Sequence, residues 1–127
     1  MTKSPIQVIE LDGPLPVAAA VLHRGLLYFS GHVGYRAGTT EVVGPDLKSQ
    51  TLCTLGHVDR HLHHHGVGRD RILMMRVYLA DVQRDFEAFN QVFRGWIGDA
   101  RHARTTVGAT LAAPELLVEI DAIVALD

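Results

Sequence analysis

Two amphipathic segments separate three groups of apolar runs, and this order restricts the fold more than any other feature of the chain. The first segment starts at Asp46, stops at Gly66, and has core-type residues at spacings of three and four: Leu47, Thr51, Leu55, Val58 and Leu62. The second begins after Asp85, closes at Gly98, and carries an aromatic stripe: Phe86, Phe89, Phe93 and Trp96 or Ile97. These patterns predict two helices, the first of about five turns, with the aromatic stripe in the core.

The remaining apolar runs predict strands. Three precede the first helix, at residues 7–11, 17–23 and 26–30, and His23-Arg24-Gly25 joins the last two as a hairpin. Residues 71–80 alternate between the helices, which places Leu73, Met75, Val77 and Leu79 on one face and Ile72, Met74, Arg76 and Tyr78 on the other. Two more strands follow the second helix, around Arg104 and Glu119.

This order predicts an α+β fold, a single domain over residues 1–127 in which both helices cover one face of a mixed sheet. The last strand is apolar on both sides, with Leu117 and Ile123 on the side away from its main apolar row. Two helices cover only one face of such a sheet. We therefore expect a closed oligomer in which sheets from several subunits pack together.

Composition excludes several classes of function. A formal net charge of −2 and a pI near 6.4 give no basic surface for phosphate, so we expect neither nucleic-acid nor membrane partners. No apolar run has the roughly 20 residues of a spanning helix, and the N-terminal segment lacks an apolar signal core. The single cysteine, Cys53, suits a reducing compartment. The expected location is the cytoplasm.

Arg104 and Glu119 are the charges that need an explanation, because each stands in an otherwise apolar strand, 15 residues apart. Burying an unpaired charge costs several kcal/mol or more, so each charge is expected to have a partner. Two hypotheses remain open from the residues alone. The pair forms a structural salt bridge across neighbouring strands, or both side chains face a polar ligand.

The motifs around these residues resemble the RidA (YjgF) family of imine and enamine deaminases. The resemblance rests on Tyr28-Phe29-Ser30-Gly31, on Ala103-Arg104-Thr105 and on the terminal Val118-Glu119-Ile120-Asp121-Ala122-Ile123 strand, and it runs roughly from Gly13 to Val124. It implies a chorismate-mutase-like (ferredoxin-like) fold, a homotrimer, and active sites in clefts between subunits. It also implies hydrolysis of 2-aminoacrylate-like imino acids to a 2-keto acid and ammonia, without a cofactor.

The chemistry fits these residues. A 2-imino acid carries a carboxylate beside an electrophilic C=N carbon. Arg104 can grip the carboxylate with its planar fork, and Glu119 can accept a proton from water and return it to the departing ammonia. Thr106 shares a face with Arg104 and is expected to line the pocket, in place of the cysteine common in the family. By resemblance, Ser30 and Gly31 also meet the substrate, and Val17 stands where a tyrosine is common.

Histidines on the first predicted helix form a separate pattern. His57, His61 and His64 or His65 fall on one face at metal-ligand spacing, with His63 nearby. No cysteine completes the set, and the only candidate carboxylates are Asp59 and Asp70. Histidine near a helix C-terminus also interacts favourably with the helix dipole, so we expect no physiological metal.

Two other functions remain possible on the same scaffold. One is a non-catalytic trimer that binds a small carboxylate metabolite or acts as a holdase. The other is a family member dedicated to one pathway with a different imine or enamine substrate. Val17, where the family commonly has a tyrosine, and His32, where a glutamine is more typical, keep the second open.

Overall fold

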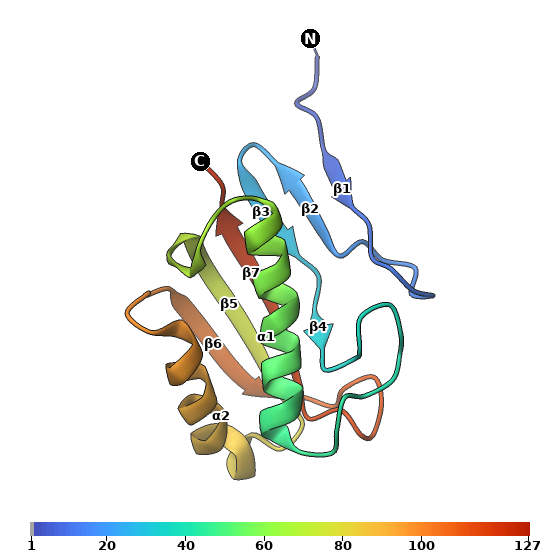
Figure 1. Cartoon of the computed structure of the whole chain (residues 1–127), viewed down its shortest axis with the longest axis vertical. Coiled ribbons are helices and arrows are strands. Elements are labelled where there is room, and N and C mark those ends of the chain that lie inside the picture. Colours follow the sequence, from blue (N-terminus) through green and yellow to red (C-terminus); the bar gives the residue numbers. More distant parts are fainter. Residues whose placement is uncertain (1) are drawn as a thin grey trace.

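The computed structural model describes residues 2–127, so residue 1 of the predicted domain lies outside the described part. In chain order the elements are β1 (Gln7–Ile9), β2 (Ala20–His23), β3 (Leu26–Phe29), β4 (His32–Val33), α1 (Leu47–His64), a 3₁₀ turn (Arg69–Arg71), β5 (Ile72–Leu79), α2 (Val82–Ile97), β6 (Ala103–Gly108) and β7 (Val118–Ala125). The strands form one mixed sheet in the order β1-β2-β3-β7-β5-β6, with β4 also paired to β7. Both helices lie on one face of this sheet (Figure 1), which confirms the predicted α+β architecture.

Helix α1 follows its prediction closely. The Asp46 side chain accepts a hydrogen bond of 2.9 Å from the Ser49 backbone N–H and caps the N-terminus. The helix ends at His64, and Gly66 follows with φ of 70°, a left-handed conformation that glycine adopts without strain. The apolar stripe of the helix is fully buried against the sheet, at Leu55, Val58 and Leu62.

Helix α2 starts earlier than predicted. Asp81, four residues before Asp85, caps it through a 3.1 Å hydrogen bond from the Arg84 backbone N–H. The inward position of the first turn is taken by Asp85, which is 7% exposed and bonds Arg84, whereas Phe86 is 39% exposed. The prediction that Phe86 joins the core stripe is therefore wrong, because the Arg84 pairing lets a carboxylate occupy that place. The rest of the stripe is buried as predicted, at Phe89, Phe93 and Trp96.

The predicted hairpin joins β2 and β3. His23 pairs with Leu26, and the two residues between them both have positive φ, 51° at Arg24 and 76° at Gly25. Positive φ at both positions is the conformation of a two-residue type I′ turn, whose twist matches that of the flanking strands. The strands are shorter than predicted, since the predicted second strand begins at Ala20 rather than at Val17.

Strand β5 lies between β7 and β6, and its alternation departs from the prediction at one end. Met75, Val77 and Leu79 are fully buried, as expected for the helix-covered face. Ile72 is buried and Leu73 is 49% exposed, the reverse of their predicted sides. The cause is a shift in the β5–β7 register between Ile72 and Met74, since one extra residue moves the side chains before it to the other face.

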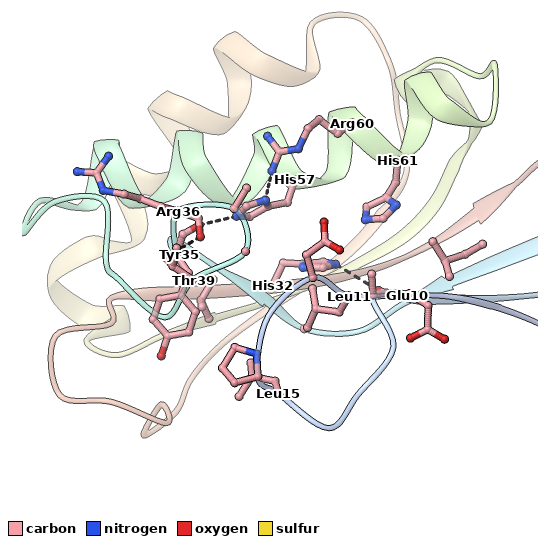
Figure 2. A pocket seen from close by; sticks show the side chains of 18 of the residues that line it. Glu10, Leu11, Leu15, His32, Tyr35, Arg36, Thr39, His57, Arg60 and His61 are labelled. Carbon is pink, nitrogen blue, oxygen red and sulfur yellow. Dashed lines mark hydrogen bonds between the residues drawn. The ribbon is translucent and has the colours of Figure 1, made fainter.

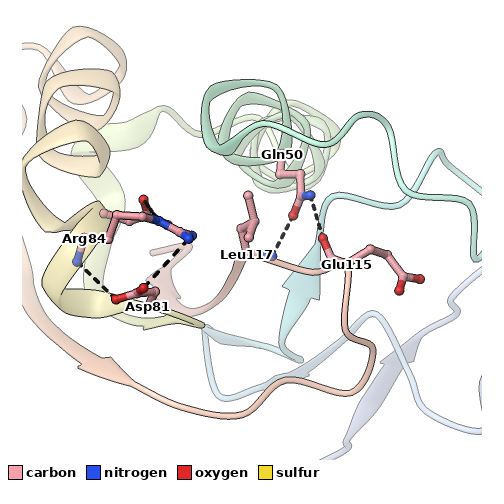
Figure 3. A network of polar contacts seen from close by, with 6 residues as sticks. Gln50, Asp81, Arg84, Glu115 and Leu117 are labelled. Atoms are coloured by element: carbon pink, nitrogen blue, oxygen red, sulfur yellow. Dashed lines mark hydrogen bonds and ion pairs between the residues drawn. The ribbon is translucent and has the colours of Figure 1, made fainter.

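A buried glutamine fixes the loop that enters β7. Gln50 of α1 is completely buried and donates from Nε2 to the carbonyl oxygens of Gly44 and Glu115, both at 2.9 Å. Its Oε1 accepts a 2.8 Å hydrogen bond from the Leu117 N–H (Figure 3). Since no water reaches this place, the side chain satisfies three backbone groups that would otherwise be unpaired. One residue thereby sets the position from which β7 and Glu119 start.

The sheet face away from the helices carries a continuous apolar row across five strands. Cross-strand partners connect Val8 to Val21, Val21 to Tyr28, Tyr28 to Ile123 and Ile123 to Met74. Within one chain this row is only partly covered, and Val8 and Tyr28 are 53% and 42% exposed. An exposed apolar surface of this extent is typical of a protein interface.

Among residues 2–127, no helix combines the length and the apolar character that crossing a lipid bilayer requires.

Candidate active site

Arg104 lies on β6 and faces helix α2. Its strand partner Met75 is fully buried under the helices, so the arginine points to the same side of the sheet. The guanidinium donates a 2.6 Å hydrogen bond to Asn90 Oδ1, and its central carbon lies 5.4 Å and 5.0 Å from the ring centres of Phe89 and Phe93. Partial burial lowers the pKa of Arg104 from its ordinary value. The result is a partly desolvated cation held in one orientation.

The neighbours of Arg104 on this side of β6 have unsatisfied polar atoms. Thr106, two residues on, shares the arginine's face as predicted, since its partner Val77 is also buried under the helices. His102, two residues before, packs its ring edge against Phe93 at 5.5 Å between centres. The Thr106 hydroxyl and both His102 ring nitrogens are buried and have no hydrogen-bond partner within residues 2–127. Because buried polar groups are normally paired, these atoms leave hydrogen-bonding capacity for a further polar partner beside Arg104.

Glu119 lies on β7 and faces the opposite side of the sheet. It sits between two buried residues of the helix-covered face, Val118 and Ile120. Burial, with a smaller contribution from the Asp121 carboxylate, raises the pKa of Glu119 above its ordinary value. No hydrogen bond or ion pair holds its carboxylate within residues 2–127. A carboxylate with a raised pKa and free oxygens is suited to accept a proton.

Gly31 lies directly against this carboxylate. A Cβ atom at position 31 would lie 2.4 Å from Glu119 Oε2, so only glycine leaves room for the present side-chain position. Ser30, just before it, donates from Oγ to the Ala18 carbonyl oxygen at 2.7 Å. This bond brings the segment containing Val17, itself 53% exposed, alongside Ser30 and Gly31. Gly31 therefore lies against Glu119, and Ser30 and the segment of Val17 lie beside Gly31.

The structure thus divides the predicted site residues into two half-sites. We call Arg104, Thr106, His102 and Asn90 the arginine half-site, and Glu119, Gly31 and Ser30 the glutamate half-site. The first lies on the helix side of β6 and the second on the opposite side of β7, with β5 between these strands. From strand spacing and register, the two Cα atoms are about 14 Å apart, and their side chains point in opposite directions.

This separation excludes the salt-bridge hypothesis within one chain. Arg104 and Glu119 lie neither on neighbouring strands nor on the same face of the sheet. Each charge is half-buried without an oppositely charged partner among residues 2–127, and the hypothesis that both face a polar ligand stays a prediction.

Comparison with known proteins identifies the family. The family model described as "Endoribonuclease L-PSP" matches residues 14–126. The RutC family protein YoaB of Escherichia coli is 32% identical over 120 residues, covering 93% of this chain and 97% of that protein. The chain belongs to the YjgF/RutC (Rid) family.

Solved structures of family members have the same fold. A YjgF family protein of Neisseria meningitidis is 29% identical, with a TM-score of 0.81 over 96% of this chain and 95% of that one. A conserved Rid family protein of Yersinia pestis, described as of unknown function, is 25% identical, with a TM-score of 0.86 over 95% of this chain and 99% of that one. The family resemblance and the fold predicted from the sequence are both confirmed.

Sequence reasoning missed one residue of the arginine half-site in this Rid-family chain. Asn90, on α2, anchors Arg104 and was not singled out. A weak signal exists, since Asn90 is an amide beside the buried Phe89 and three residues before the buried Phe93. A neutral, hydrogen-bonding side chain at the border of an apolar stripe indicates that something polar faces it from outside the helix.

The histidines of α1 are not arranged as a metal centre. No group of three or more histidine, cysteine, aspartate or glutamate side chains within residues 2–127 is placed to hold a metal ion. One ring nitrogen of His57 is hydrogen-bonded to the Tyr35 carbonyl oxygen at 2.8 Å, and the other is hydrogen-bonded to the Arg60 guanidinium. His65 bonds the His61 carbonyl oxygen at 2.8 Å, and His64 packs against the His65 ring. The metal-ligand spacing read from the sequence therefore has another explanation for most of its members.

Proposed function

We propose that this chain is a hydrolytic deaminase of reactive 2-imino and enamine acids that releases a 2-keto acid and ammonia. The observation that carries the proposal is the state of Arg104. Its guanidinium is partly desolvated, fixed by Asn90, and without a carboxylate partner among residues 2–127. Such a cation binds a planar carboxylate strongly, because two parallel N–H···O bonds form in a setting where water competes weakly.

The reaction needs one base and one carboxylate anchor. Arg104 holds the substrate carboxylate and so fixes the adjacent C=N carbon. Glu119 takes a proton from water as the water oxygen bonds to this carbon, and the C=N electron pair moves to nitrogen. The protonated Glu119 then gives its proton to nitrogen, which becomes an amino group. Glu119 next takes the hydroxyl proton as the oxygen forms the keto group, and passes it to nitrogen as the C–N bond breaks, so nitrogen leaves as ammonia and Glu119 is a carboxylate again. Imino acid and water become keto acid and ammonia, with the enzyme unchanged.

The two half-sites meet in this proposal only across an interface. Arg104 and Glu119 lie on opposite sides of one sheet, so a substrate bridging them requires the arginine half-site of one subunit and the glutamate half-site of its neighbour. The exposed apolar row of Val8, Val21, Tyr28, Ile123 and Met74 supports such an assembly, because a monomer would leave it in water. We propose a homotrimer, because three subunits form the smallest closed ring in which one heterologous contact repeats between neighbours.

The description of the family model names an endoribonuclease, and we favour the deaminase for an electrostatic reason. The net charge of −2 provides no general attraction for a polyanion. The carboxylate of Glu119 and its neighbour Asp121 would also repel phosphates from the glutamate half-site. A small carboxylate bound to a single arginine does not face this repulsion.

The test follows ammonia release from 2-imino acids made in place by an amino-acid oxidase. Arg104→Ala is expected to lower kcat/KM on the order of 100-fold, and Glu119→Gln by at least as much through kcat. Two exposed neighbours give matched controls, Arg101→Ala and Glu115→Gln, and both should match wild type. If wild type releases ammonia no faster than buffer across several imino acids, the chain is a binding protein or holdase instead.

A mixing experiment tests the shared site. In co-refolded oligomers of Arg104→Ala and Glu119→Gln, about a quarter of the clefts would combine an intact arginine with an intact glutamate. Activity should recover toward that level. No recovery in oligomers shown by mass to be mixed would mean that each chain works alone, and a stable monomer by light scattering would contradict the assembly itself.

A further inference from the structure

A cavity of about 480 Å³, which we call the second cavity, shares only Gly31 with the two half-sites. It is enclosed by α1, by residues 31–39 and by residues 9–15 (Figure 2). His32 lines it and pairs with the buried Ile120, so this cavity is on the helix side of β4. Glu119, which pairs with Val33, faces the other side, and neither Glu119 nor Arg104 lines the cavity. Its volume falls in the range of pockets for small organic ligands.

Three imidazoles form one wall. The His32 ring centre lies 5.8 Å from that of His57 and 5.8 Å from that of His61. Two of the rings are oriented by backbone carbonyl oxygens, His32 Nε2 by Ala19 at 3.2 Å and His57 Nε2 by Tyr35 at 2.8 Å. The His61 ring has no hydrogen bond within residues 2–127. This wall is therefore built with a fixed geometry and retains free hydrogen-bonding capacity.

Two arginines at the same cavity have no acidic partner. Arg60 is hydrogen-bonded to the His57 ring, and Arg36 makes one long bond of 3.4 Å to the Val43 carbonyl oxygen. Neither forms an ion pair with a carboxylate in the described part of the chain, whereas Arg69, Arg76 and Arg84 do. Two unpaired cations beside neutral hydrogen-bonding rings provide a binding surface for an anion.

The wall opposite is largely apolar. The segment over residues 9–15 contributes Ile9, Leu11, Pro14 and Leu15, and its two carboxylates are Glu10 and Asp12. Neither carboxylate is bonded to Arg36 or Arg60. A ligand that satisfies both walls therefore needs an anionic end for α1 and an apolar body for Leu11 and Leu15. Inorganic phosphate would satisfy only the first of them.

We propose that this cavity is a second binding site, which takes a small organic carboxylate with its charged end at Arg60 and His61 and its apolar body against Leu11 and Leu15. The site is separate from the proposed deaminase site and does not depend on it. Gly31 connects the two, since its backbone lines this cavity while its Cα packs on the Glu119 carboxylate. A ligand here would thus press on the residue that sets the position of Glu119.

Proton uptake should accompany binding. Burial, with smaller effects of neighbouring histidines and Arg60, lowers the pKa of His61, and burial and Arg60 also lower the pKa of His57, so both rings are neutral at pH 7. An anion placed beside them favours the protonated form. The charged and titratable groups around His61 come from α1 and its C-cap (His57, Arg60, His64 and His65), from β4 (His32) and from the facing loops (Glu10, Asp12, Tyr35 and Arg36). Most of these are bases, so affinity should rise as pH falls from 7.5 to 6.

The experiment is calorimetric titration with benzoate in the Arg104→Ala background, which removes the carboxylate anchor of the candidate active site. Benzoate is expected to bind, with proton uptake seen as a dependence on buffer ionisation enthalpy. Adding Arg60→Gln should weaken binding about tenfold or more, since a charged hydrogen bond is lost. His63→Asn, on the same helix but outside the cavity, should change nothing. Because Arg60 is exposed, circular dichroism is expected to show an intact fold.

Several results would overturn the proposal. Benzoate binding that disappears with Arg104→Ala alone would place the ligand at the candidate active site only. Binding unaffected by Arg60→Gln would contradict the anion-binding role of the α1 wall, and tighter binding of inorganic phosphate than of benzoate would contradict the role of the apolar wall. None of these results bears on ammonia release, so the deaminase proposal is judged separately.

Discussion

Replacing Gly31 with alanine should separate catalysis from stability in this protein. The new methyl group would lie 2.4 Å from Glu119 Oε2 and 2.9 Å from Glu119 Cδ. Ordinary contact needs about 3.5 Å, so the carboxylate must move by about 1 Å. It can do so at low cost, because it is the end of a flexible, half-exposed side chain with no hydrogen bond to break.

The expected effect on stability is small. Overpacking in a rigid core costs about 1–3 kcal/mol, and this site lies at or below the lower end because the side chain can rotate away. Position 31 does not have a positive φ, so alanine also gains about 0.4–1 kcal/mol from a less flexible unfolded chain. The net change in the free energy of unfolding is about 1 kcal/mol or less. Activity should fall far more, on the order of 100-fold, because a base misplaced by 1 Å no longer reaches the attacking water.

The assay pairs urea unfolding with ammonia release from an enzymatically generated imino acid. Gly95→Ala on α2 is the matched control, since a Cβ there meets nothing within 4 Å. It should raise stability by about 0.5–1 kcal/mol and leave activity unchanged. Wild-type activity in Gly31→Ala would refute the reasoning, because the contact between Gly31 and Glu119 would then have no part in placing the base.

Three further predictions follow from individual side chains. Gln50→Glu keeps the shape of the side chain but points an oxygen at two carbonyl oxygens. Urea unfolding at pH 7 should show a loss of about 3 kcal/mol in the free energy of unfolding. The control Gln91→Glu, at an exposed position, should lose less than about 0.5 kcal/mol. Asn90→Ala should raise KM severalfold by releasing Arg104. Asn90→Asp keeps the shape but should raise KM further, because the new carboxylate competes with the substrate carboxylate for Arg104. Equal KM values for the two variants would contradict this role of Asn90. Burial, followed by the charges of His57 and His61, lowers the pKa of His32 from 6.5 to about 4. Between these pH values the unfolded chain therefore binds more protons than the folded chain. The contribution of His32 to stability is present above pH 6.5 and is lost as the pH falls toward 4. Urea unfolding between pH 4.5 and 7.5 should show this loss, about 3 kcal/mol if complete, and His32→Gln should flatten it; an unchanged slope in the variant would exclude His32 as the cause.

Elements with a strong local signal were predictable. Helix α1 has a cap, a regular apolar period and a terminal glycine, and each of these depends on residues close in the chain. The hairpin turn at Arg24-Gly25 is equally local. The errors in α2 and β5 share a different cause. Asp85 occupies an inward position because Arg84 neutralises it, and Ile72 changes face because of a register shift against β7, and neither event is visible in the period of the segment itself.

The candidate site shows the same division. Its chemistry was predictable, because an arginine and a glutamate in apolar strands need partners wherever they lie. The support of Arg104 by Asn90 was not, since it depends on how α2 packs over β6. The three imidazoles around the second cavity also come together only in the fold, where β4 brings His32 beside two histidines of α1.

The sequence by itself determined the elements, the family and the pair of charged residues that any function must explain. Tertiary structure decided how that pair is used. The strand order puts β5 between Arg104 and Glu119, and the pleat sends their side chains to opposite faces, so one chain holds two half-sites rather than one site. The physical reason is that strand order and register are set by pairing between distant segments, whereas alternation and helical period are set by neighbours in the chain.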